Sequence, residues 1–257
     1  MNIVHKRLFS SFIINILIII IFIISLILEI IDIQTNPTSV YKNTWGLFRF
    51  FTIDGNLFSI ISCIILSVKQ FMILKKSKEE NINSLLFSHF NYIIGLMAAS
   101  VDLLIFIVVM CILVPLSGEE GLNLINTFNA SGFHITIPIL LNIRFIFLDT
   151  RERDLIIYEK LYGGIPMFLY GIIMLILCIC KVFTGYGENG DGKIPYPFLD
   201  VYHQNIFVCI FSGLFIFGFG FGIGFLLDFF NKKCENIICP YNYLRKEDVN
   251  TVIELVE

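Results

Sequence analysis

Six long runs of apolar residues dominate the chain, and shorter polar stretches separate them. A membrane-spanning helix needs about 20 mostly apolar residues, and each run reaches that length. The runs predict transmembrane helices over residues 8–31, 47–74, 90–116, 124–148, 161–183 and 206–230. The first run follows Lys6 and Arg7. It is too long for the apolar part of a signal peptide, which has about 7–15 residues, so we expect a retained span.

Basic residues gather on one side of these spans. With the N-terminus inside, 12 of the 18 Lys and Arg residues fall on the cytoplasmic side, and only Lys42 and Lys193 fall outside. Basic residues mark the cytoplasmic side of membrane proteins. The sequence therefore predicts an all-α polytopic membrane protein with six transmembrane helices in one bundle and both termini cytoplasmic. We expect residues 1–230 to form the transmembrane domain and residues 231–257 a short cytoplasmic tail.

The composition supports a membrane protein and excludes other classes. Apolar residues make up 56% of the chain and charged residues 15%, and the mean hydropathy is +0.82. Soluble domains have about 45–50% apolar and about 25% charged residues. A soluble enzyme, a secreted disulfide scaffold and a disordered protein are thereby excluded. The net charge of -3 and the lack of a dense basic cluster argue against a nucleic-acid partner. The bias toward Ile, Asn, Lys and Phe indicates an AT-rich genome, and we expect a bacterial cell membrane.

Few charged residues lie within the predicted spans. Asp54 and Asp102 have no easy route to water, so we expect them to face protein or a water-filled cavity. Four others lie near span ends, and we expect them to snorkel to the lipid headgroups: Lys69, Arg144, Lys181 and Asp228. The seven cysteines show no metal-binding or disulfide spacing, so we expect neither a metal nor a cofactor.

Polar residues form a stripe on two of the spans, at the spacing of a helix face. In the second span they are Arg49, Thr52, Asn56, Ser59, Cys63, Ser67 and Gln70. In the fourth span they are Thr127, Ser131, His134, Pro138 and Asn142. We expect both stripes to turn inward. Ser59, Ser67 and Thr127 are interpreted as polar contacts that hold helices together.

Among these polar residues, Thr52 and His134 are candidates for a catalytic nucleophile and its base. At about 1.5 Å per residue, they lie about 8 Å and about 14 Å below the outer boundary. A hydroxyl becomes a good nucleophile when a base such as neutral imidazole takes its proton. Asn56, one turn below Thr52, is a candidate oxyanion donor, and Arg49, one turn above, is a candidate ligand for an anionic group. A histidine that only packs or forms hydrogen bonds remains an alternative.

Four segments resemble motifs of a bacterial family of predicted six-pass membrane proteins. Residues 50–57, Phe-Phe-Thr-Ile-Asp-Gly-Asn-Leu, are similar to its FT-x-x-x-N-L motif. His134-x-x-x-Pro138 and Pro166-x-x-x-Tyr170 resemble its motifs in spans four and five. Residues 195–201, Pro-Tyr-Pro-Phe-Leu-Asp-Val, resemble its element before the last span.

That family is similar to the androgen-induced membrane hydrolases, which cleave fatty acid esters within the membrane. The resemblance implies Thr52 as nucleophile and His134 as base. One position departs from the pattern, because Arg144 stands where the family has an acidic residue. Asp102 or Asp200 is a candidate to supply that acid, although Asp200 can also cap the last helix.

Three functions remain open at this point. The first is an integral membrane hydrolase of lipid esters that uses Thr52 and His134, with membrane lipid as partner and an acyl ester as substrate. The second is a small transporter or channel in which Asp54 and Asp102 serve a proton or cation path. The third is a structural membrane protein whose polar stripes only hold helices together. The oligomeric state is left open.

Overall fold

The computed structural model describes residues 3–35, 48, 50–75, 89–115, 122, 125–150, 153–180 and 205–238. These residues form helices and their connections, with no strand among them. Six helical segments are long and apolar enough to cross a membrane: Lys6–Thr35, Phe51–Lys75, His89–Leu113, Phe128–Phe147, Ile157–Ile179 and Ile206–Glu235. The predicted all-α, six-span architecture is confirmed, and the protein is an integral, multi-pass membrane protein.

Three of the spans are single α-helices, and three change helix type along their length. The single helices are α1 (Ile3–Thr35), α2 (Phe51–Lys75) and α10 (Ile206–Ile238). The third span is α4 (His89–Ile107) followed by the π-helix η3 (Val108–Leu113). The fourth is α6 (Phe128–Ser131), the π-helix η4 (Gly132–Thr136) and α7 (Ile137–Phe147). The fifth is α8 (Ile157–Lys160), the 3₁₀-helix η5 (Leu161–Gly164) and α9 (Ile165–Ile179).

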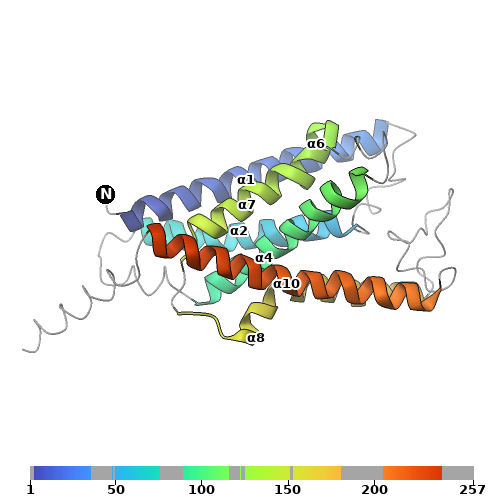
Figure 1. Ribbon diagram of the computed structural model, residues 1–257. Helices are drawn as coiled ribbons and strands as arrows, with labels where there is room; N and C mark the ends of the chain where they lie inside the picture. Colours follow the sequence, from blue (N-terminus) through green and yellow to red (C-terminus); the bar gives the residue numbers. More distant parts are fainter. Residues whose placement is uncertain are drawn as a thin grey trace, which may run out of the picture.

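Four of these helices form a closed ring. Helix α1 packs against α2, α2 against α4, α4 against α7, and α7 against α1, so the four surround a shared interior (Figure 1). That interior contains fully buried apolar side chains from all four helices, among them Ile18, Cys63, Leu96 and Leu141. The candidate site residues of the second and fourth spans therefore belong to elements of one ring.

The last two spans pack on the outside of this ring, against α4 and α7. Helix α10 contacts α4, α7 and η5. Gly224 makes the close approach, because a Cβ placed there would lie 2.3 Å from the carbonyl oxygen of Lys160. A Cβ at Gly220 would lie 2.4 Å from the sulfur of Met167. These two glycines thus act as small residues that let membrane helices come close.

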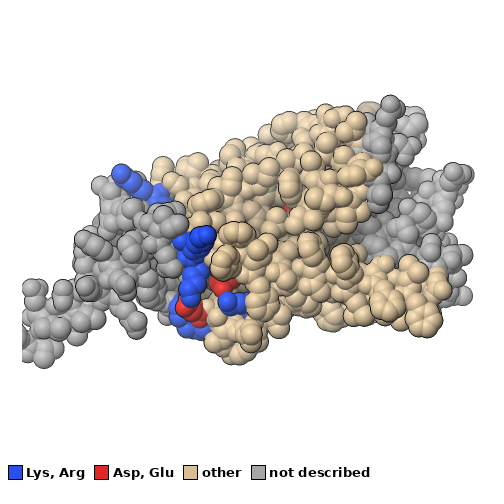
Figure 2. Space-filling model, viewed as in Figure 1, with Lys and Arg blue, Asp and Glu red and all other residues tan. Residues whose placement is uncertain are grey.

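On the face shown in Figure 2, the Lys and Arg side chains gather at the end of the bundle where α1 begins. Among the described residues, this half contains all of the Lys and Arg side chains: Lys6, Arg7, Lys69, Lys75, Arg144, Arg153, Lys160, Lys232 and Lys233. We call it the basic half, and the opposite half, where α2 begins and where Thr52 lies, the apolar half. The asymmetry agrees with the pattern from which we expect cytoplasmic termini.

Candidate functional site

Thr52 and His134 lie on neighbouring elements in the apolar half. Thr52 is in the first turn of α2, and His134 is in the middle of η4. Both side chains are partly buried. Helix α2 and η4 are in contact. The ring of helices therefore brings the two predicted catalytic residues to the same part of the bundle.

Asn56 is the residue that ties these two elements together. Its side chain is fully buried, and its amide nitrogen donates to the main-chain oxygens of Thr52 (2.7 Å) and Phe133 (3.2 Å). Both hydrogens of the amide nitrogen are thus occupied by carbonyl groups. Asn56 connects the residue before His134 to the turn that contains Thr52. Its predicted role as oxyanion donor would require one of these two bonds to break, so the structure favours a positioning role.

His134 lies in a π-helical turn for which the sequence gives a reason. Pro138 has no N–H, so it cannot donate to the carbonyl of His134, four residues before it. The turn widens instead, and the N–H of Ile137 donates to the carbonyl of Gly132, five residues back. Single π-helical turns within α-helices are frequent at functional sites, because they change the direction of one or two side chains.

The surroundings of this turn are apolar and closely packed. The ring of Phe133 contacts that of Phe22 at a centroid distance of 5.7 Å. Gly132 faces α1 so closely that a Cβ there would lie 2.1 Å from the hydroxyl of Ser25. Phe51, next to Thr52, contacts the ring of Tyr170 at 5.0 Å, so α9 borders the site as well.

Two buried polar atoms of the site have no hydrogen-bond partner within the described ranges. The Nδ1 atom of His134 and the Oδ1 atom of Asn56 are buried, and neither has a hydrogen-bond partner among the described residues. No hydrogen bond joins Thr52 to His134 in the described part of the chain. Buried polar groups without a partner cost free energy, so they mark a place where a water molecule or a ligand group would be stabilising.

The acidic and basic residues predicted to support the site differ in their burial, and two of them lie outside the described residues. Asp102 faces the interior as expected: it is fully buried on α4, beside Ser59 and within electrostatic range of Arg144. Within the part of the chain that the structure describes, neither carboxylate oxygen has a hydrogen-bond partner, and the Ser59 hydroxyl donates to the main-chain oxygen of Ala98 at 3.5 Å. Asp54 is only partly buried. Arg49 and Asp200 lie outside the described residues.

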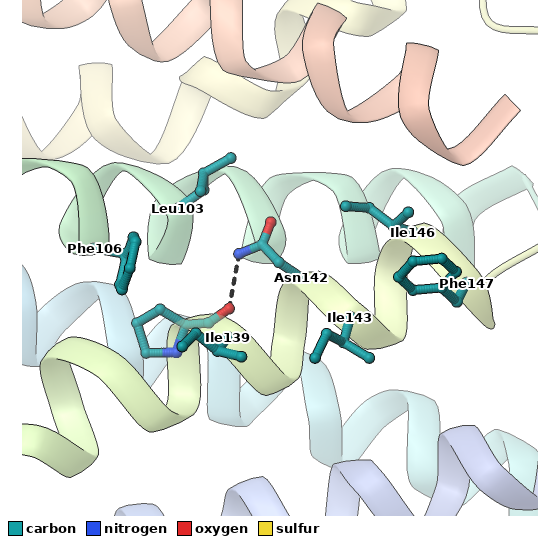
Figure 3. A pocket seen from close by; sticks show the side chains of 8 residues that line it. Leu103, Phe106, Ile139, Asn142, Ile143, Ile146 and Phe147 are labelled. Carbon is teal, nitrogen blue, oxygen red and sulfur yellow. Dashed lines mark hydrogen bonds between the residues drawn. The ribbon is translucent and has the colours of Figure 1, made fainter. Parts of the chain in front are cut away.

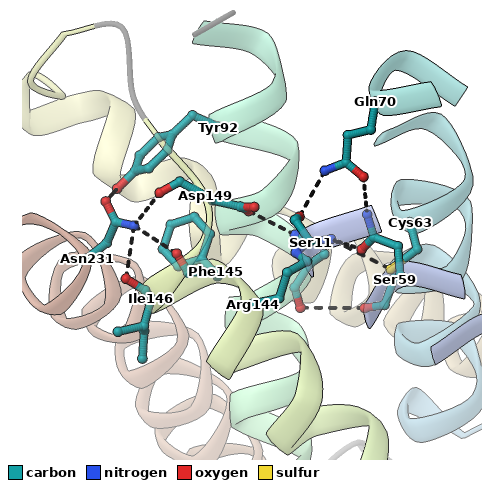
Figure 4. A network of polar contacts seen from close by, with 12 residues as sticks. Ser11, Ser59, Cys63, Gln70, Tyr92, Arg144, Phe145, Ile146, Asp149 and Asn231 are labelled. Atoms are coloured by element: carbon teal, nitrogen blue, oxygen red, sulfur yellow. Dashed lines mark hydrogen bonds and ion pairs between the residues drawn. The ribbon is translucent and has the colours of Figure 1, made fainter. Parts of the chain in front are cut away.

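Arg144 does not snorkel to the headgroups, and that expectation was wrong. Its side chain is fully buried and donates to Asn15 (2.7 Å) and Asp149 (3.0 Å), with the sulfur of Cys63 at 3.7 Å (Figure 4). Because several groups stabilise the guanidinium inside the bundle, it has no need to reach water. Burial raises the pKa of the Asp149 carboxyl above its usual range, and the Arg144 guanidinium opposes that shift.

Asp228 is likewise buried rather than exposed to the headgroups. It forms an ion pair with Lys160 at 2.9 Å and accepts a hydrogen bond from Tyr92 at 3.0 Å. Lys69 donates to Asn91 at 2.6 Å. Lys181 lies outside the described residues. The basic half therefore contains internal ion pairs where the sequence had suggested isolated charges near the membrane surface.

The two polar stripes behave differently. On α2, Asn56, Ser59, Cys63, Ser67 and Gln70 are all buried, as predicted. On the fourth span Pro138 is buried, whereas Thr127 is exposed and caps α6 by accepting from the N–H of Ala130 at 3.4 Å. The second stripe turns inward only in part, because Thr127 lies just before the span, as the N-cap of α6 with an extended backbone.

Sequence reasoning missed the polar residues that α1 and α10 contribute. Asn15 donates to Gln70 at 3.1 Å, and Gln70 donates to Ser11 at 2.8 Å. Asn231 on α10 donates to main-chain oxygens of Phe145 and Asp149. Ser11 and Asn15 are four residues apart within an otherwise apolar run, and that spacing was the available signal.

Comparisons with known proteins add no relative. No protein-family model, no curated protein and no solved structure matches the chain. The architecture and the contacts described above therefore carry the functional argument.

Proposed function

We propose that the protein is an integral membrane hydrolase of fatty acid esters, with Thr52 as nucleophile and His134 as general base. One observation carries the proposal: the Asn56 amide joins the Thr52 turn of α2 to the main chain beside His134. The Nδ1 atom of His134 is buried and has no partner in the described part of the chain, which supports the proposal further. The motif resemblance implies the same two roles.

The chemistry follows from the two side chains. The ring nitrogen of neutral His134 takes the Thr52 hydroxyl proton as Oγ1 bonds to the carbonyl carbon of the ester. The alcohol leaves with that proton as the tetrahedral intermediate collapses, and the acyl group remains on Thr52. A water molecule, deprotonated by the same imidazole, then attacks this ester and releases the fatty acid and the free hydroxyl. The apolar surroundings strengthen each electrostatic contact by excluding bulk water.

The location of the site suggests how a substrate enters. Basic residues mark the cytoplasmic side, so the apolar half with Thr52 and His134 belongs to the outer leaflet of what we infer to be a bacterial cell membrane. Membrane lipid is the proposed partner, and an acyl ester that reaches the site from the surrounding bilayer is the proposed substrate. Arg49 and Asp200 are assigned to this outer mouth from the sequence pattern alone.

A second function is favoured by a different observation. Asp102 is fully buried, with two carboxylate oxygens that lack partners among the described residues. Ionisable groups inside membrane proteins mark proton or ion pathways. In a transporter or channel, Asp102→Asn would abolish transport, and Thr52→Ala would leave it intact. In the hydrolase, Thr52→Ala has the larger effect.

Hydrolysis of a fluorogenic fatty acid ester by the purified protein in lipid nanodiscs tests the proposal. We expect Thr52→Ala and His134→Gln each to lower the rate by at least about 100-fold, the usual contribution of a positioned base. Thr52→Ser, which retains the hydroxyl, should keep a measurable rate. Ser67→Ala is the matched control, because it removes another buried hydroxyl of α2 at the opposite end of the helix. An unchanged rate for Thr52→Ala would overturn the proposal in favour of a transporter or a structural protein.

A further inference from the structure

Asp102 is buried in the interior of the ring without a hydrogen bond to its carboxyl group. Its side chain on α4 is fully buried, and neither of its oxygen atoms has a partner in the described ranges of the chain. The Ser59 hydroxyl beside it donates to the main-chain oxygen of Ala98 at 3.5 Å. An ionised carboxylate can only accept hydrogen bonds, whereas a neutral carboxyl group can also donate one. The charge of Asp102 must therefore be balanced by a nearby cation or removed by a proton.

The surface side of the contact between α4 and α7 supplies no cation among the described residues. A groove opens there, and its walls are apolar side chains apart from the Asn142 amide (Figure 3). Leu103, which follows Asp102 on α4, lines this groove, whereas Asp102 does not. Ile139 and Ile143 on the opposite wall are each 42% exposed, so lipid chains face the groove. A group that balances Asp102 must therefore come from inside the ring.

Arg144 is the cation that lies within electrostatic range of Asp102. It is fully buried, and its guanidinium donates to Asp149 at 3.0 Å and to Asn15 at 2.7 Å. In Figure 4 it lies between Asp149 and Cys63, whose sulfur is 3.7 Å away. No hydrogen bond from Arg144 reaches Asp102 in the part of the chain that the structure describes. One guanidinium thus faces two buried carboxyl groups and pairs with one of them.

Other charged groups near these helices do not balance Asp102. Arg7, at the start of α1, donates to the main-chain oxygen of Phe147 at 3.0 Å and acts on Asp149. Two further acids have cations of their own, Asp228 with Lys160 and Glu159 with Arg153. Further titratable groups on the neighbouring helices are either uncharged near neutral pH, as thiols and phenols are, or lie in the apolar half: Cys63, Tyr92, Asp54 and His134.

We propose that Asp102 and Asp149 bind one proton between them, and that Arg144 balances whichever carboxylate is ionised. Two ionised carboxylates beside one guanidinium would leave an unbalanced charge in an apolar interior, which costs far more than binding a proton. In the arrangement described above Arg144 pairs with Asp149, so the proton is on Asp102.

Asp149 is the member of the pair that can exchange this proton with water. Its side chain is 12% exposed, just past the end of α7 in the basic half, whereas Asp102 is 0% exposed. When the proton moves from Asp102 to Asp149, Arg144 turns to Asp102, and the net charge of the three groups stays at zero. The ring thus contains a site that takes up a proton from the basic half. This site goes beyond the proposed ester hydrolysis and does not depend on it.

Infrared spectroscopy of the full-length protein at neutral pH tests the proposal, in maltoside micelles that contain no carbonyl groups. A neutral carboxyl group absorbs at a higher frequency than the amide carbonyl groups, and isotope labelling of the aspartate carboxyl carbons shifts its band. We expect the band of a neutral aspartate in the wild type. Asp102→Asn should remove the amplitude of one carboxyl group. Asp149→Asn should remove it as well, because Arg144 is then free to pair with Asp102.

Matched variants separate this site from other acids and from catalysis. Asp154→Asn should leave the band unchanged, because Asp154 is 65% exposed and pairs with Lys232. Thr52→Ala should also leave it unchanged, so a failure of this proposal and a failure of the hydrolase proposal are distinguishable. A wild type without a neutral aspartate band would overturn the proposal, and this outcome needs no variant. A band that survives Asp102→Asn would overturn its assignment, and one that persists in folded Asp149→Asn would overturn the sharing of one proton.

Discussion

Among the described residues the ion pairs lie in the basic half, whereas the buried polar atoms of the candidate site lie in the apolar half and form no ion pair. In the basic half, Arg144 contacts Asn15 and Asp149, and Asp228 contacts Lys160 and Tyr92. In the apolar half, the buried Nδ1 of His134 and Oδ1 of Asn56 have no partner among the described residues. The Arg144 and Asp228 side chains and the atoms without a partner are all buried, and they lie on the same few helices. Burial alone therefore does not explain why only some of them have partners.

The comparison separates residues that stabilise the fold from residues that are available for chemistry. Arg144 connects α7 to α1 through Asn15 and to α2 through Cys63, and Asp149 balances its charge. Removal of one member of the Arg144–Asp149 pair leaves a buried charge in an apolar interior. Groups such as His134 Nδ1 form no hydrogen bond to any residue that the structure describes. We therefore expect substitutions in the basic half to change stability and substitutions at Thr52 and His134 to change activity.

The largest expected effect on stability is at Arg144. Arg144→Met keeps most of the side-chain volume but removes the ion pair to Asp149 and the hydrogen bond to the Asn15 side-chain oxygen. We expect a loss of about 3–5 kcal/mol of unfolding free energy, the usual cost of breaking a buried ion pair. Chemical unfolding in detergent micelles measures it. The double variant Arg144→Met with Asp149→Asn should recover part of the lost stability. A loss below about 1 kcal/mol for Arg144→Met alone would mean that the buried Arg144 contacts do not hold the helices together.

A smaller effect is expected where α10 approaches η5. Gly224→Ala places a Cβ 2.3 Å from the carbonyl oxygen of Lys160, so α10 must shift. We expect a destabilisation of about 1–3 kcal/mol, typical of overpacking. Gly222→Ala is the matched control on the same helix, because nothing lies within 4 Å of its Cβ position. Equal thermal stability of the two variants would contradict this packing.

Asn56 is expected to affect both stability and activity. Asn56→Leu removes the hydrogen bonds to Thr52 and Phe133, and we expect a loss of about 1 kcal/mol of stability. Because the bond to Phe133 positions His134, the rate of ester hydrolysis should fall by far more than that stability loss accounts for. Thermal stability and hydrolysis rates measured on one preparation test this. A loss of stability with normal activity would make Asn56 a purely structural residue.

The smallest effect is expected at the membrane surface. Lys232 and Asp154 form an ion pair at 2.7 Å, with exposed fractions of 48% and 65%. Exposed pairs of this kind contribute about 0–1 kcal/mol, and salt screens them. We expect Lys232→Ala to change the unfolding free energy by no more than that amount. A loss comparable to that of Arg144→Met would show that the distinction between buried and exposed pairs fails.

The sequence predicts the spans well because length and hydropathy are local properties, and six apolar runs leave little choice of architecture. The buried stripe of α2 was predictable for the same reason, since a regular helix keeps its phase. The exposure of Thr127 was not, because the helix begins only at Phe128 and Thr127 is its N-cap with an extended backbone. The π-turn at Gly132–Thr136 was also not predicted, although Pro138, which cannot complete an α-helical turn, was the available signal for it.

The sequence could not show which side chains from distant segments contact one another. Arg144 was expected near lipid headgroups because its position close to a span end is visible in the chain, whereas its contact with Asn15 is not. The Asn56–Phe133 bond joins residues 77 apart and depends on how α2 packs against η4. Helix rise gave depths of about 8 Å for Thr52 and about 14 Å for His134, and it could not reveal their shared connection through Asn56.

The most direct test of the central claim is the rate of fatty acid release from an ester lipid by wild type and Thr52→Ala in nanodiscs, with thermal stability measured on the same samples. The account predicts equal stability and a rate lower by at least about 100-fold in the variant. An equal rate in two equally stable proteins would show that Thr52 is not a nucleophile and would contradict the account.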